Sequence, residues 1–323
     1  MQLAPHRPRP NLFLVGAMKS GTTWLCQLLA AHPAVFISSP KEPTRFVDPQ
    51  VLRRVWPYMW RQGYCSDEER YLELFATAGN AAIIAEASTA YSQAPIYGGV
   101  PQRILAFNPQ ARFLYIMRDP VERTISHYWH RVRAAREHRA MLAAIRSDPQ
   151  YTAVSHYARQ LREYLQHVKR ERIYVLTLEE LLADPPGQMR QLLRWLGVDV
   201  QVKLPQPRAV NTRPETLQQV RGFGILDRCR HISWYRSAAP HLPHMLRELG
   251  VRLAVRTVRP AHVDDRSARD YLRSVQHPQT EELGRLLGRA FPEWTTLHST
   301  PVSSVRQREK GAPILSPSGL WRG

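Results

Sequence analysis

Short apolar runs alternate with amphipathic segments over the first two thirds of the chain. Five of the runs have the length of a strand: 12–15 (LFLV), 35–37 (VFI), 81–86 (AAIIAE), 112–117 (RFLYIM) and 172–177 (RIYVLT). Between them, apolar residues recur at helical spacing in the segments 22–31, 121–138 and 156–170. Apolar strands that alternate with helices predict an α/β fold, in which helices cover both faces of a parallel sheet.

The pattern changes after about residue 200, where no further run reads as a strand. Segments such as 244–250 (HMLRELG) and 280–291 (TEELGRLLGRAF) predict helices instead. From Ser299 onward the chain carries turn formers and little apolar pattern, which is typical of a loose terminus. We therefore expect one domain over 11–298 with a mostly helical C-terminal third, a basic proline-rich segment over 1–10 and a flexible tail over 299–323.

Composition narrows the class of protein. A chain of 323 residues with 43% apolar content can bury one large core. No run approaches the roughly 18 apolar residues of a membrane span, and the first ten residues lack the apolar region of a secretory signal. The cysteines Cys26, Cys65 and Cys229 are scattered and show no CxxC spacing. We therefore expect a cytoplasmic protein with reduced thiols, no membrane span and no metal site.

The net charge of +18 is large. Such a charge is typical either of a solvated basic surface or of a protein with an anionic ligand. No helix-turn-helix, zinc-finger or RNA-binding signature accompanies the arginines, so we expect no nucleic-acid partner. A non-catalytic protein that binds polyanions stays open as an alternative.

The stretch GAMKSGTT (16–23) lies between the first predicted strand and the first predicted helix. This order of strand, glycine loop and helix is the context of a phosphate-binding loop, in which backbone N–H groups at the helix start attract an anion. In a Walker loop a lysine follows the second glycine, but here Thr22 follows Gly21 and the lysine is Lys19, inside the loop. That position suits a nucleotide with a single 5′-phosphate that carries a small group.

A second candidate anion site follows the fourth apolar run. Arg118 stands at the predicted carboxyl end of a strand, where ligands bind in open α/β sheets, and its planar guanidinium matches phosphate oxygens. Ser126 follows two helical turns later. The segment from Asp119 to Glu122 predicts a capping box. Alternatively Asp119 could hold Mg²⁺ as a Walker-B-like acid, which together with Lys19 would indicate a P-loop kinase that uses ATP.

The two motifs together resemble those of the sulfotransferases, which use 3′-phosphoadenosine-5′-phosphosulfate (PAPS). KSGTTWL (19–25) resembles their 5′-phosphosulfate loop, and Arg118 with Ser126 resembles their 3′-phosphate motif. The resemblance implies that Lys19 bridges the 5′-phosphate and the transferring sulfuryl group, that the product is adenosine 3′,5′-bisphosphate, and that Trp24 lies against the adenine. It also implies a cradle for the 5′-phosphate made by Ser20, Gly21, Thr22 and Thr23. Because a sulfuryl group carries less charge than a γ-phosphoryl group, we expect Lys19 to neutralise the leaving oxygen without a metal.

A candidate base follows the second run, in SSPKEPTRF (38–46), where Pro40 and Pro43 flank Lys41-Glu42. This stretch is similar to the KExxFF element of the heparan-type glycan sulfotransferases, which implies that Glu42 is the catalytic base. A surface ion pair of Glu42 with Lys41 or Arg45 is the alternative. The stretch IIAEASTAYS (83–92) resembles the EKxPxY element of the same branch, with Ala87 where a lysine is common.

Further matches extend the resemblance over 11–294. Tyr157 is implied as a cofactor neighbour, and Arg221-Gly222 as a basic loop that closes over the 3′-phosphate. We interpret His127 and His130 as packing or surface residues. The implied function is transfer of a sulfuryl group from PAPS to a hydroxyl, or secondarily an amine, of a carbohydrate or small natural-product acceptor. The sequence leaves the oligomeric state open.

Overall fold

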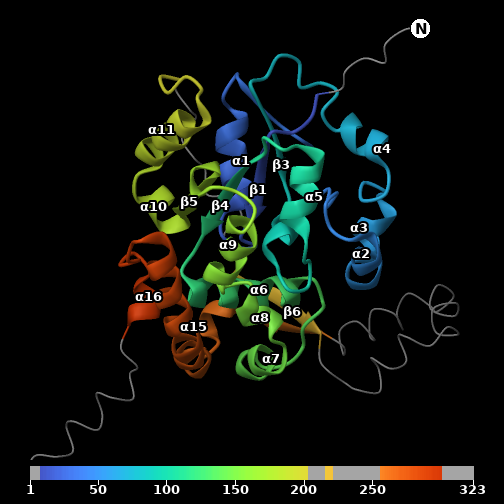
Figure 1. The fold of residues 1–323 in the computed structure, drawn as a ribbon. Helices are drawn as coiled ribbons and strands as arrows, with labels where there is room; N and C mark the ends of the chain where they lie inside the picture. Colours follow the sequence, from blue (N-terminus) through green and yellow to red (C-terminus); the bar gives the residue numbers. More distant parts are fainter. Residues whose placement is uncertain (1–7, 203–214, 221–254, 300–323) are drawn as a thin grey trace, which may run out of the picture.

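A five-stranded parallel sheet forms the centre of the molecule, with the strand order β2-β3-β1-β4-β5 (Figure 1). The computed structural model describes residues 8–202, 215–220 and 255–299. The strands are β1 (Leu12–Gly16), β2 (Val35–Ile37), β3 (Ile83–Ala87), β4 (Arg112–Met117) and β5 (Ile173–Thr177). Each of them coincides with one of the apolar runs to within two residues, so the α/β prediction is confirmed.

The first strand shows why the runs are apolar throughout. Leu12 of β1 pairs in parallel with Ala85 of β3 and with Arg112 of β4. Phe13 and Val15 belong to the core on one side of the sheet, and Leu12 and Leu14 belong to the core on the other side. Since both faces of the sheet are buried, alternation between apolar and polar residues is absent. Because all the strands run in parallel, their carboxyl ends meet at one edge.

Helices cover both faces of this sheet (Figure 1). One core contains side chains of α1 (Thr22–Ala30), α10 (Leu178–Ala183) and α11 (Pro185–Leu196). The opposite core contains side chains of α5 (Val100–Phe107), α6 (Pro120–Arg133), α9 (Tyr157–Leu165) and α15 (Arg266–Leu287).

The remaining helical segments are short. They are α2 (Pro49–Val55), α3 (Pro57–Arg61), α4 (Glu68–Glu73), η1 (Thr89–Ser92), α7 (Met141–Ser147), α8 (Gln150–Ala153), η2 (Arg170–Arg172), η4 (Pro260–His262) and α16 (Thr295–His298). In Figure 1, α2, α3 and α4 lie together at one flank of the molecule.

The described part of the C-terminal third is mostly helical but also contains two strands. β6 (Leu217–Val220) and β7 (Val255–Val258) pair in an antiparallel two-stranded sheet. The prediction that strands end near residue 200 is therefore wrong. The sequences LQQV and VRTV form no apolar run, so their strand structure depends on pairing between segments far apart in the chain. The predicted helix over 244–250 lies outside the described residues, as do 1–7 and 300–323 of the predicted termini.

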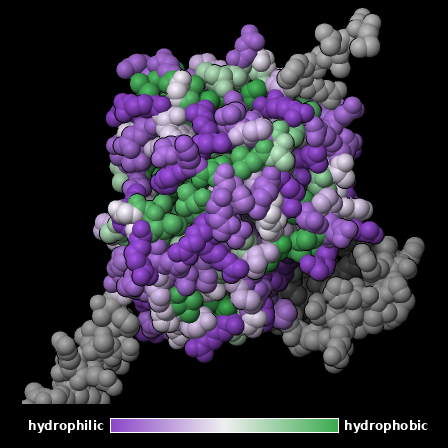
Figure 2. Space-filling view, viewed as in Figure 1, coloured by the Kyte–Doolittle hydropathy of each residue, from purple (hydrophilic) through white to green (hydrophobic). Residues whose placement is uncertain are grey.

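The surface in the view of Figure 1 is mostly hydrophilic, with a diagonal band of apolar residues across it (Figure 2). Among the described residues, the large hydrophobic side chains that are exposed are Val55, Tyr58 and Leu182. A helix long and apolar enough to cross a lipid bilayer is not found in 8–202, 215–220 or 255–299.

Candidate active site

The glycine loop joins β1 to α1 at the carboxyl edge of the sheet. Gly21 adopts φ 85°, a left-handed conformation that favours glycine, and a Cβ there would lie 2.7 Å from Leu178 Cδ1. A Cβ on Gly16 would lie 1.9 Å from Ser92 Oγ. Both glycines are therefore required by close packing of the loop. Lys19, between them, also adopts a left-handed backbone, with φ 70°.

The N-terminus of α1 is open to an anion. Gly21 is the N-cap, no side chain caps the helix, and its first turn contains no acidic residue. The N–H groups of a first helical turn have no partner within the helix and carry partial positive charge. Ser20 and Thr22 are buried at this point and Thr23 is partly exposed. The predicted cradle residues therefore surround uncapped N–H donors, which is the arrangement that binds a phosphate.

Lys19 lies in a cluster of positive charge. Burial lowers the pKa of its ammonium group, and Arg133, Arg118 and Arg123 lower this pKa further. Within the described part of the chain, no carboxylate forms an ion pair with Lys19. Of these four cations, Arg118 has the Glu122 carboxylate at 3.6 Å, and the remaining positive charge is unfavourable unless an anion joins it. This part of the site is therefore suited to bind an anion.

Arg118 follows β4 directly and is held by its backbone. The Tyr157 hydroxyl donates to Arg118 O at 2.7 Å, and the buried Tyr157 ring packs against the rings of Tyr115 and Trp294. The guanidinium is one quarter exposed and lies 3.6 Å from the Glu122 carboxylate. Tyr157 thus lies next to Arg118, and its contact is with the backbone of Arg118.

Ser126 lies on α6, two turns beyond Arg118, and is partly exposed. The two residues predicted to bind the 3′-phosphate therefore lie in consecutive segments, Arg118 directly after β4 and Ser126 on α6.

Asp119 is the N-cap of α6, as predicted. Its Oδ1 accepts from the N–H groups of Val121 and Glu122 at 2.9 and 3.2 Å, and its Oδ2 accepts from Leu297 N–H at 3.0 Å. The reciprocal half of the capping box is wrong, because Asp119 N–H donates to Glu179 instead, at 3.0 Å. Both oxygens of Asp119 thus fasten structural elements, which argues against the Mg²⁺ role that a kinase would require.

Arg123 is a residue of the site that the sequence analysis missed. Its guanidinium is fully buried and donates to Ser155 Oγ, Thr124 Oγ1 and Tyr151 O. Its Nη1 has no hydrogen-bond partner in the described structure, and burial lowers the pKa of the group to about 10. An arginine among the apolar residues of a helix face was the available signal in the sequence.

Glu42 lies in the loop after β2 and is bound to the segment after β3. Its carboxylate accepts from Thr89 N–H at 2.8 Å and from Thr89 Oγ1 at 2.9 Å, and its own N–H donates to Ala87 O at 2.9 Å. Arg45 pairs with Glu68 instead, so the alternative of an ion pair between Glu42 and Arg45 is wrong. Glu42 has φ 62°, a sparsely populated conformation for a residue with a side chain.

The charge of Glu42 is set by competing effects. Burial raises the pKa of its carboxyl group, whereas Lys41 and the Thr89 hydrogen bonds oppose this rise. A carboxylate with a raised pKa that still accepts hydrogen bonds has the properties of a general base.

A second carboxylate, Glu86 at the end of β3, supports the loop of Glu42. It is fully buried and accepts from Tyr71 Oη at 2.6 Å and from Ser88 Oγ at 2.7 Å. Ser88 Oγ in turn accepts from Thr44 N–H at 3.1 Å, two residues after Glu42. Burial raises the pKa of Glu86 to about 7, although these donors act in the opposite direction.

This raised pKa predicts a pH-dependent stability. Between the ordinary value of 4.5 and about 7, folded Glu86 keeps a proton that the unfolded chain loses. The resulting stabilisation is complete below pH 4.5 and is lost as the pH rises through 7, by about 3 kcal/mol in total at roughly 1.4 kcal/mol per pH unit. We expect Glu86→Gln to flatten this fall in the free energy of unfolding, measured by urea denaturation. An equal slope in the variant would assign the fall to another group.

Lys41 also reaches the glycine loop. Its Nζ lies 3.2 Å from Thr22 Oγ1 and 3.3 Å from Thr23 Oγ1. Thus the segment after β2 contacts both the first turn of α1, through Lys41, and the segment after β3, through Glu42. The sequence analysis considered Lys41 only as an ion-pair partner of Glu42.

Other predicted positions have different surroundings. Trp24, on α1, is only 8% exposed and belongs to the core on that side of the sheet. Little of its indole is therefore accessible to an adenine. Burial lowers the pKa of His127 and lowers that of His130 to about 4, which fits the packing role assigned to them. Arg221 and Gly222 lie outside the described residues.

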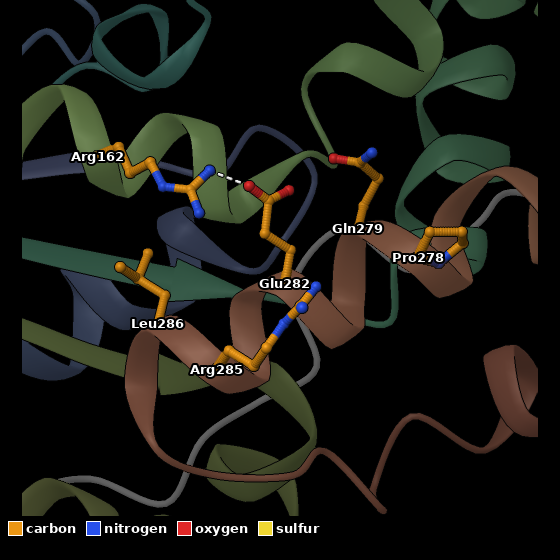
Figure 3. A pocket seen from close by; sticks show the side chains of 6 residues that line it. All are labelled: Arg162, Pro278, Gln279, Glu282, Arg285 and Leu286. Atoms are coloured by element: carbon orange, nitrogen blue, oxygen red, sulfur yellow. Dashed lines mark hydrogen bonds and ion pairs between the residues drawn. The ribbon is translucent and has the colours of Figure 1, made fainter.

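A pocket of about 560 Å³ lies elsewhere, between α9 and α15 (Figure 3). It is lined by Arg162, Pro278, Gln279, Glu282, Arg285 and Leu286. Arg162 and Glu282 form an ion pair across it. Its lining includes none of the predicted site residues, so it is separate from the candidate active site.

The parallel sheet, the glycine loop with its uncapped helix and the carboxylate after the next strand define a P-loop-type α/β protein with a candidate anion site. Comparison with known proteins gives the particular family. Residues 10–202 match the model of the sulfotransferase family, so the chain belongs to this family. The crystal structure of a sulfotransferase from Alicyclobacillus acidocaldarius is similar over 89% of this chain and 99% of that chain, at 26% identity and a TM-score of 0.65.

Curated relatives include enzymes of heparan sulfate. The chain is 25% identical over 209 residues to the bifunctional heparan sulfate N-deacetylase/N-sulfotransferase 2 of Homo sapiens, a match of 58% of this chain and 22% of the relative. It is 23% identical over 234 residues to the heparan sulfate glucosamine 3-O-sulfotransferase 3B1 of Mus musculus, covering 70% and 53%. The chain therefore spans about a fifth to a half of the length of these relatives.

Proposed function

We propose that this sulfotransferase takes the sulfuryl group from PAPS and transfers it in line to a hydroxyl group of a carbohydrate or small natural product. The observation that carries the proposal is the cluster of cations around Lys19, next to an uncapped helix N-terminus. Among the described residues Lys19 itself pairs with no carboxylate, and Glu122 pairs with Arg118. Arg118, at the end of the neighbouring strand, supplies a second cation for the 3′-phosphate. A nucleotide phosphorylated at both ends of its ribose would bring one anion to Lys19 and another to Arg118.

The residues would divide the work as follows. The loop N–H groups with Thr22 and Thr23 bind the 5′-phosphate, and Lys19 neutralises the charge that develops on the leaving oxygen. Glu42 accepts the proton of the acceptor hydroxyl, and Thr89 keeps the Glu42 carboxylate in position. PAPS supplies a sulfuryl group that is activated by its anhydride link to phosphate.

The relatives and the net charge support a carbohydrate as the acceptor. The heparan sulfate relatives act on a carbohydrate by their names, and the net charge of +18 suits an anionic acceptor. The amine remains a secondary acceptor, since one relative is named an N-sulfotransferase.

The test of the donor is a melting-temperature screen followed by a transfer assay. We expect adenosine 3′,5′-bisphosphate to raise the Tm more than AMP, ADP or ATP, with or without Mg²⁺, because only the bisphosphate occupies both cationic sites. Transfer of labelled sulfate from PAPS to a panel of carbohydrate and phenolic acceptors would then follow. Stabilisation by ATP and Mg²⁺ without any response to the bisphosphate would instead establish a kinase.

Arg118→Ala is expected to weaken binding of adenosine 3′,5′-bisphosphate by roughly 10- to 100-fold, the range for a lost charge-assisted hydrogen bond. Binding of AMP should change little, because AMP has no 3′-phosphate. Titration calorimetry with both nucleotides measures the discrimination. Arg190→Ala, which removes an exposed arginine of α11, is the matched control. Equal losses for both nucleotides would remove Arg118 from the 3′-phosphate site.

A further inference from the structure

A second lysine points at the start of α1 from outside the glycine loop. The Lys41 ammonium lies within hydrogen-bond distance of the Thr22 and Thr23 hydroxyl oxygens, at 3.2 and 3.3 Å. An ammonium group has only donors, so both hydroxyl oxygens must accept from it. Each threonine then has its single O–H proton left to donate elsewhere. Both threonines lie in the first turn of the helix that follows the loop.

The position of Lys41 is unfavourable with respect to the dipole of α1, although the neighbouring Glu42 carboxyl group interacts favourably with it. The N-terminus of a helix carries partial positive charge and stabilises anions, whereas cations are favoured at the opposite end. Lys41 nevertheless lies at the N-terminus of α1, and Lys19 lies in the loop directly before it. Within the described ranges, Lys41 forms no ion pair with a carboxylate. The titratable groups around it are Glu42 and Cys26, and burial raises the pKa of both.

We propose that Lys41 is a positioning residue of the phosphosulfate site. By donating to the oxygens of Thr22 and Thr23, it turns their two hydroxyl protons toward the 5′-phosphate. This inference rests on the proposed function and adds to it a cation that is outside the loop. It also explains why lysine and base are neighbours in the sequence: one loop orients the donor through Lys41 and activates the acceptor through Glu42.

The test is a mutant cycle read by binding of adenosine 3′,5′-bisphosphate in calorimetry. Lys41→Met is expected to weaken binding by roughly 10- to 100-fold, and the double variant Thr22→Val/Thr23→Val by a similar factor. Because Lys41 acts through the hydroxyls, the triple variant should lose little beyond the larger of these two losses. Lys41→Arg, which keeps the donors, should retain most of the affinity.

Two controls separate positioning from folding. Lys169→Met removes an exposed lysine just before β5, at the opposite edge of the sheet, and should leave binding unchanged. The Tm of free Lys41→Met should not fall below that of the wild type, since a cation leaves a helix N-terminus.

The possible results lead to distinct conclusions. Unchanged bisphosphate affinity in Lys41→Met, or strictly additive losses in the triple variant, would overturn the role of Lys41 while the wild type still binds. A wild-type protein that binds no bisphosphate would overturn the proposed donor and this inference together.

Discussion

Replacement of Lys19 by alanine is expected to reduce sulfuryl transfer by about 10³-fold or more, since the loss of even one neutral donor to a developing oxyanion costs about 10²- to 10³-fold. Lys19 is the only lysine of the loop, and the arginines near it lie on α6 and at its start rather than in the loop. We therefore expect none of these arginines to take over the contact of the Lys19 ammonium group with the leaving oxygen. Steady-state rates with saturating PAPS and acceptor measure the effect.

The thermal stability of the ligand-free protein should not fall when Lys19 is replaced, although the transfer rate does. The pKa of Lys19 is lowered in the folded state, so a protonated Lys19 costs stability at neutral pH, and removal of its charge relieves that cost. Lys19→Met, which preserves the side-chain length, is therefore expected to keep or raise the Tm while it abolishes transfer. A variant that is inactive because it is unfolded would show a lower Tm, and one with intact activity would exclude Lys19 from the reaction.

The second large effect is expected for Glu42→Gln, which should lower turnover by about 10²-fold or more, the usual range for loss of a general base. A glutamine can still accept from Thr89 N–H, so the loop keeps one of its two contacts. Bisphosphate affinity should stay close to that of the wild type. Parallel measurement of kcat and of bisphosphate binding separates the two roles. If both fall together, Glu42 is a structural residue.

The pH profile gives an independent test of Glu42. Because burial raises its pKa, the acidic limb of the rate profile should lie above the ordinary value of 4.5 for a glutamate. Thr89→Val removes the hydroxyl that donates to the carboxylate and so disfavours its ionised form. The acidic limb should therefore move to higher pH in this variant. An acidic limb that is the same in Thr89→Val and in the wild type would argue that another group titrates.

Part of the site was accessible from sequence because its geometry is local. The spacing of Gly16 and Gly21 between a strand and a helix is sufficient to predict the loop, and both glycines prove to be required by close contacts. Asp119 before a proline predicts the N-cap of α6, which is confirmed. The capping box failed because a distant residue, Glu179, accepts the N–H that Glu122 was expected to bind.

Residues whose role depends on distant neighbours were missed. Arg123 reads as one arginine among many, and only packing of α6 on the segment that contains Tyr151 and Ser155 buries it without a carboxylate. Strands β6 and β7 have no apolar run, and they form because the two segments pair with each other. Lys41 and Thr89 likewise acquire their contacts only when the segments after β2 and β3 lie beside the loop.

The sequence by itself determined the sheet, the phosphate loop and the family to which the chain belongs, because each depends on a short pattern of apolar residues, glycines and charges. The tertiary structure alone decided which cations lie near Lys19 and which groups bind the Glu42 carboxylate. Parallel strands bring their carboxyl ends to a single edge, so Lys19, Glu42 and Arg118, far apart in the chain, come to the same side of the sheet. Their charges then depend on burial and on neighbours from other strands, which no local pattern encodes.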